Sequence, residues 1–146
     1  MAYTNALSAY KETRIRTASQ GQLIVMLYDE AVKQLERCTE LLNPNKSDRQ
    51  DPSRIEIIGK AIIKTRDIIT ELMVSLDFDQ GGEIAQNLFS LYTWFNKELL
   101  EAHMSLDRDR IEAVKNQIAD LRTAWAEIAT RTNTEGRILE GVNIAG

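Results

Sequence analysis

Side chains that could carry catalysis are scarce in this sequence. His103 is its single histidine, and Cys38 is its single cysteine. A Ser–His–Asp arrangement would have to recruit His103 from the middle of a helical stretch, and no nucleophile elbow accompanies it. Cys38 falls on the apolar stripe of a predicted helix, which is typical of a small buried side chain rather than a reactive thiol. We therefore expect a protein that is not an enzyme and has no catalytic residues.

Metal and cofactor sites are disfavoured by the same shortage of ligands. The di-iron site of a four-helix bundle needs two Glu-x-x-His pairs, whereas Leu100 stands three residues before His103. His103 and Met104 could in principle ligate a haem, but a solvated histidine near a helix C-terminus, where the dipole favours its charge, is the commoner case. Residues 77–79 lack the spacing of a calcium loop, and the glycines at 81–82 lack that of a phosphate loop. We expect no cofactor and no metal.

Length and charge narrow the class of protein further. The chain has 146 residues, of which 43% are hydrophobic, which is enough for one domain with its own core. A net charge of -4 without a basic patch argues against nucleic-acid binding. No apolar run approaches the roughly 18 residues of a membrane span, and the first ten residues do not resemble a secretory signal. The lone cysteine suits a reducing compartment, so we expect a cytoplasmic protein without membrane insertion.

Apolar residues recur at steps of three and four in four long stretches, which predicts amphipathic helices. Ser19 and Gln22 form a capping box for the first helix, and Asp51 followed by Pro52 starts the second. Gly81 and Gly82 should break the chain before the third helix. The expected helices run from residue 19 to about 42, from 51 to about 76, from 83 to 104, and onward from a capping box of Asp109 and Glu112.

Four helices of this length with short connections predict an all-α fold, an antiparallel up-down four-helix bundle. We divide the chain into an N-terminal cap segment (1–18), the bundle (19–133) and a flexible C-terminal tail (134–146).

The bundle carries more apolar residues than one stripe per helix requires. Residues 23–28 are six apolar side chains in succession, and Leu23 and Leu27 lie off the inner stripe of their helix. Two interpretations compete: the extra residues widen the packed stripe, or they line a groove for a partner helix that the apolar residues of 3–15 cover when it is empty. The second helix adds a further line of such residues, namely Ile57, Ala61 and Ile68.

Three sequence blocks follow one another over roughly residues 7–130. They are Tyr10 … Thr17-Ala18-Ser19 … Leu23 … Met26-Leu27-Tyr28-Asp29, then Leu72 … Leu76-Asp77 … Gly81-Gly82-Glu83-Ile84-Ala85-Gln86-Asn87-Leu88 … Leu91-Tyr92, and Leu121-Arg122 … Trp125 … Ile128. In this order, the blocks resemble the FliS family of flagellin-specific flagellar export chaperones. Two departures stand out: Gln20-Gly21 where the family commonly has Pro-Glu, and Glu30 where it commonly has Gly. Neither departure alters an apolar face.

This resemblance implies a chaperone of the bacterial cytosol that binds the disordered C-terminal segment of flagellin. It would prevent premature polymerisation and aid delivery to the flagellar type III export apparatus, with an export-gate protein and flagellar regulators such as an anti-sigma factor as further partners. It also implies an N-terminal cap, here assigned to Leu7, Tyr10 and Ile15. The alternative is a generic helical module for structure or oligomerisation. We expect a monomer or weak dimer whose groove is lined by Leu23, Leu27, Ile57, Ala61 and Ile68.

Overall fold

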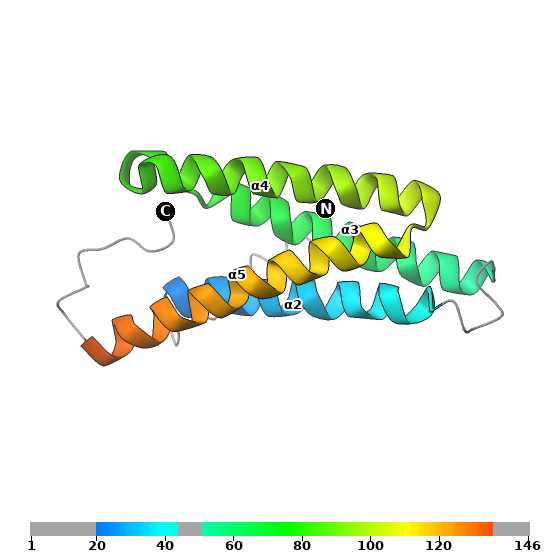
Figure 1. Cartoon of the computed structure of the whole chain (residues 1–146), viewed down its shortest axis with the longest axis horizontal. Helices are drawn as coiled ribbons and strands as arrows, with labels where there is room; N and C mark the ends of the chain where they lie inside the picture. The colour runs from blue at the N-terminus through cyan, green and yellow to red at the C-terminus, as the bar shows by residue number, and fades with distance from the viewer. Residues whose placement is uncertain (1–19, 44–50, 136–146) are drawn as a thin grey trace.

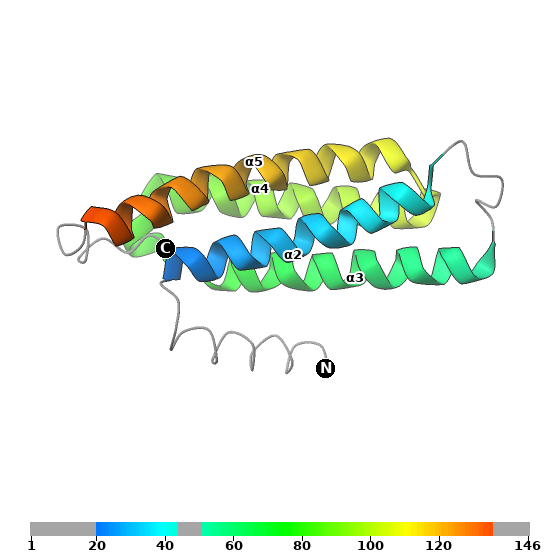
Figure 2. The ribbon, with the colours of Figure 1, turned by 90° about the horizontal axis from the view of Figure 1, so that it is seen from below.

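The computed structural model describes residues 20–43 and 51–135, and these form an antiparallel bundle of four helices (Figures 1 and 2). Each helix packs only against its two neighbours in the cyclic order α2, α3, α4, α5. The predicted all-α up-down bundle is thereby confirmed. The cap segment at 1–18 lies outside the described residues, as do positions 136–146. The helices are α2 (Gln20–Leu41), α3 (Pro52–Val74), α4 (Phe78–Ser105) and α5 (Arg108–Glu135).

The core follows the predicted stripes because each helix turns its row of three- and four-spaced apolar residues inward. On α2 the sealed residues include Ala31, Leu35 and Cys38, none of which has any exposed surface. Trp125 of α5 also belongs to the core, whereas Trp94 of α4 is more than one-third exposed. One contiguous apolar cluster therefore joins all four helices.

The predicted start of α3 is confirmed, whereas α4 and α5 begin at other residues than predicted. Asp51 caps α3 as predicted, since its carboxylate accepts a hydrogen bond from the Ser53 backbone N–H at 2.9 Å. The prediction that Asp109 caps α5 is wrong. The cap is Asp107, whose carboxylate accepts from the Arg110 backbone N–H at 3.2 Å, and α5 begins at Arg108.

The double glycine bends the third helix instead of preceding it. Asp77 accepts hydrogen bonds from the backbone N–H groups of Asp79 and Gln80, so α4 starts at Phe78, about one turn before the expected residue 83. Gly82 then adopts φ +49° and ψ -123°, a conformation that side chains with a Cβ rarely tolerate, and inserts a kink. The expected break is thus an internal bend.

Polar contacts stabilise the end of the bundle at which the chain connects α4 to α5. Arg110 of α5 pairs with Glu98 and Glu101 of α4 at 3.4 Å and 3.1 Å. Arg108 donates a hydrogen bond from Nε to the Thr39 carbonyl at 3.1 Å, which ties the start of α5 to the last turn of α2. This end, which we call the closed end, holds three of the four helices together.

Candidate functional site

Most of the predicted groove residues are inside the protein. Leu27, Ala61 and Ile68 belong to the contiguous core, and Ile57 is half-buried. Leu23 is only 2% exposed but is not part of that core cluster. In the described conformation these side chains widen the packed stripe, the first of the two interpretations above. Their role as partner contacts therefore requires a conformational change and stays a prediction. The other predicted contacts, Leu7, Tyr10 and Ile15, lie outside the described residues.

A different apolar surface opens along the inner stripe of α4. At the closed end this stripe is fully buried, at Phe95 and Leu99. Toward the start of α4 the same stripe becomes exposed: Leu91 and Leu88 are half-buried, and Ile84 is 69% exposed. Residues seven and eleven positions apart lie on one helix face, so Ile84 points to the same side as the sealed residues. Ala85 beside it stays buried, so the core continues at this end but leaves Ile84 exposed.

The facing stripe of α5 opens in the same direction. Ile111, Val114 and Ile118 are buried near the closed end, whereas Leu121 and Ile128 are only half-buried. Figure 1 shows the cause, since the start of α4 and the end of α5 diverge from each other. The contact between α4 and α5 is the least extensive of the four helix pairs. We call these incompletely buried residues the open-end strip: the exposed Ile84 and the half-buried Leu88 and Leu91 of α4, with the half-buried Leu121 and Ile128 of α5.

Small residues lie where α5 packs closely on α2. Gly21 of α2 meets Ala129 of α5 so closely that a Cβ added to Gly21 would lie 3.3 Å from the Ala129 Cβ. The two helices also make the most extensive contact in the bundle and lie side by side in both views (Figures 1 and 2). Farther along, Arg122 of α5 pairs with Asp29 of α2 at 2.6 Å. Close packing on α2 thus accompanies the separation from α4.

A hydrogen-bonded aromatic group lies in the core beside the strip. The hydroxyls of Tyr28 on α2 and Tyr92 on α4 hydrogen-bond each other, and the Trp125 side chain also hydrogen-bonds Tyr28. Burial raises the pKa of Tyr92 to about 12. Burial, with repulsion from Tyr92, also raises the pKa of Tyr28 above its ordinary value. Both hydroxyls therefore stay neutral near pH 7, where they position helices and have no base beside them that would activate them.

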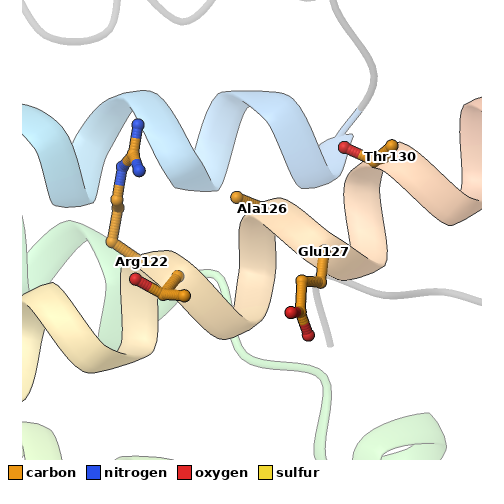
Figure 3. Close-up of a pocket in the computed structure, with 5 residues that line it drawn as sticks. Arg122, Ala126, Glu127 and Thr130 are labelled. Atoms are coloured by element: carbon orange, nitrogen blue, oxygen red, sulfur yellow. The ribbon is translucent and has the colours of Figure 1, made fainter.

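An open depression of about 480 Å³ lies on the outer side of α5 (Figure 3). Its lining mixes a cation, an anion and small side chains, and Arg122 extends toward α2 while Glu127 points away from it. Because its two charged side chains have opposite signs, this surface does not concentrate charge for a ligand. The lining residues are Arg122, Thr123, Ala126, Glu127 and Thr130.

The two residues first considered for catalysis, Cys38 and His103, both contact α3. Cys38 is fully buried, with its sulfur 3.7 Å from the Ile58 carbonyl, and burial raises the pKa of the thiol to about 12. His103 is half-buried in the last turn of α4 and packs against Gly59 of α3, where an added Cβ would lie 2.9 Å from the imidazole Nε2.

Neither residue is therefore placed for catalysis. Within 20–43 and 51–135, no group of three or more potential ligands could hold a metal ion. None of the helices in those ranges is both long and apolar enough to cross a membrane.

Comparison with known proteins points to one family. The chain matches the family model for flagellar protein FliS over residues 3–132. The flagellar secretion chaperone FliS of Salmonella typhimurium is 32% identical, over 84% of this chain and 85% of that protein. Its namesakes in Escherichia coli and Bacillus subtilis are 31% and 24% identical, over 80% and 87% of this chain and 80% and 88% of their own lengths. Since the family model spans nearly the whole sequence, the chain belongs to the FliS family of flagellar secretion chaperones.

Proposed function

We propose that this protein binds the C-terminal segment of flagellin in the bacterial cytosol, keeps it from polymerising, and aids its delivery to the flagellar type III export apparatus. Membership of the FliS family supports the export role. The open-end strip supports the binding role, because a partly disordered client that folds on binding needs exposed apolar surface to cover. The scarcity of catalytic side chains also favours binding over chemistry.

The observation that carries this proposal is the exposure of Ile84 on a helix face whose other apolar residues are buried or half-buried. An apolar client side chain that packed on Ile84 would extend the apolar stripe that runs through Leu88 and Leu91 to Phe95. Such a contact buries surface on both partners and is dominated by a few apolar anchors. The loss of free energy on ordering the client, about 2–5 kcal/mol, keeps the complex releasable for export.

Calorimetric titration with a flagellin C-terminal peptide tests the proposal. We expect a Kd of about 1 µM or below for the native protein. Ile84→Ser should weaken binding about tenfold, which corresponds to about 1.4 kcal/mol. The matched control is Ile63→Ser on α3, because Ile63 is also exposed, at 51%, but lies outside the strip. No binding at micromolar concentration would refute the function. Equal affinity of the two variants would refute only the location.

Self-association is the alternative function, and one observation favours it. Phe78 and Phe89 form an exposed edge-to-face pair, with ring centroids 5.9 Å apart, on the surface of α4. An exposed aromatic pair can serve as an anchor for a second copy. Sedimentation separates the two functions, since a tight dimer that ignores the flagellin peptide supports the oligomerisation module.

A further inference from the structure

We propose that residues 136–146, which directly follow α5, bind the open-end strip of the same molecule and so compete with any partner for that surface. The strip has Ile84 at 69% exposure beside half-buried leucines. A segment that covered Ile84 and the half-buried leucines would remove their remaining apolar surface from water. The chain that continues from Glu135 starts at this end of the bundle.

The position of the helix ends supports this occupant. α5 ends at Glu135, at the same end of the bundle at which α4 begins (Figure 1). Eleven residues can extend about 36 Å at most. The α4 part of the strip, from Ile84 to Leu91, covers seven residues of helix, or about 10 Å. The segment is therefore long enough to turn back from Glu135 and follow the strip.

The composition of the segment also suits an apolar surface. Its two charged side chains, Arg137 and Glu140, have opposite signs. Gly136 and Gly141 permit the chain reversal that binding beside α5 requires. The larger apolar side chains of the segment can pack against the strip. They are Ile138, Leu139, Val142 and Ile144.

Attachment makes even weak contacts effective. A short covalent connection holds an attached segment at an effective concentration on the order of 1 mM. A segment with an intrinsic Kd of about 0.1 mM would then cover the strip in roughly ten of every eleven molecules. This regulatory consequence rests on the proposed function, because it requires the client to use the same strip. Binding of the segment to the strip does not require it.

Thiol labelling of the full chain tests the proposal without flagellin. Ile84→Cys places a reactive group on the strip, and the natural Cys38 stays silent because it is fully buried. We expect a second variant, with the four aliphatic residues of 136–146 replaced by serine, to raise the labelling rate of Ile84→Cys about tenfold. Labelling of Ile63→Cys, the control on α3, should be the same in both backgrounds.

Each outcome of the labelling experiment either supports or overturns the proposal. Equal labelling rates at Ile84→Cys with and without the serine substitutions would overturn the proposal. Protection that survives those substitutions and grows with protein concentration would also overturn it, in favour of a second copy. Tail-dependent protection would support it, and a flagellin peptide titrated into both backgrounds then separates the two ideas. Unchanged client affinity would leave the tail contact established while showing that the client binds elsewhere.

Discussion

The Tyr28 hydroxyl is the shared partner in the polar contact at the centre of the bundle, because both Tyr92 and Trp125 hydrogen-bond it. Tyr28→Phe would leave two buried polar groups without this partner, whereas Tyr92→Phe leaves Tyr28 bonded to Trp125. We expect losses in the free energy of unfolding of about 2 kcal/mol and about 1 kcal/mol respectively. Urea unfolding of the two variants measures the difference, and equal losses would show that Trp125 contributes nothing to the group.

Buried hydroxyl and thiol groups also make the free energy of unfolding depend on pH in the alkaline range. Burial raises the pKa of Cys38 from 9.0, and that of Tyr92 from 10.0, to about 12, and it raises the pKa of Tyr28 as well. Between the ordinary and the raised pKa, the unfolded chain loses a proton that the folded chain keeps. The free energy of unfolding therefore falls as pH rises.

We expect this loss to begin near pH 9 and to steepen above pH 10, at up to about 1.4 kcal/mol per pH unit for each group involved. Urea unfolding between pH 7 and pH 11 measures it. Cys38→Ala should remove the portion that begins near pH 9 and leave the portion that begins near pH 10. A stability profile that is flat up to pH 11 would contradict the burial of these groups.

At the scale of the helices, the spacing of apolar residues was sufficient to predict all four. The period at which apolar residues recur identifies the buried face of a helix without any knowledge of the helices packed against it. The errors fell where backbone geometry decides: Asp107 rather than Asp109 caps α5, and Gly82 bends α4 internally. In both cases several residues could have served, and only the backbone path of the connection selects one of them.

The packing of α5 on α2 gives a prediction at the same scale. Gly21→Leu should cost about 1–3 kcal/mol, because its side chain would have to enter the space held by Ala129. Gly82→Ala should cost about 1–2 kcal/mol for a different reason, namely its positive φ, since nothing lies within 4 Å of the added Cβ. Thermal unfolding measures both. Adding Ala129→Gly should restore part of the loss in the first variant and none in the second.

For the whole molecule, sequence reasoning found the class of protein but not the exposed surface. Leu23 and Leu27 look surplus in the sequence, yet they are buried, whereas Ile84 looks like core and is exposed. The pattern marks which face of a helix is apolar, but not how far two helices diverge along their length. The packing of α5 involves contacts such as Gly21 against Ala129, which join positions more than one hundred residues apart in the sequence.

The N-terminal cap remains a prediction at this scale. Leu23 suits a covered contact, since it is buried without belonging to the contiguous core. Deletion of residues 1–15 should increase the association rate with a flagellin peptide several-fold, because the open state would no longer compete with a bound cap. Stopped-flow mixing measures the rate. An association rate and Kd identical to those of the full chain would remove the cap from the mechanism.

The contrast between the two ends of the bundle implies a gradient in how easily its backbone opens. Amide protons near Phe95 and Leu99, beneath the ion pairs of Arg110, should exchange with solvent only when the whole protein unfolds. Amides in the first turns of α4, ahead of and just beyond Gly82, should exchange through small local openings. A guest chain could then enter by displacing one loosely held turn, while the opposite end keeps the host folded.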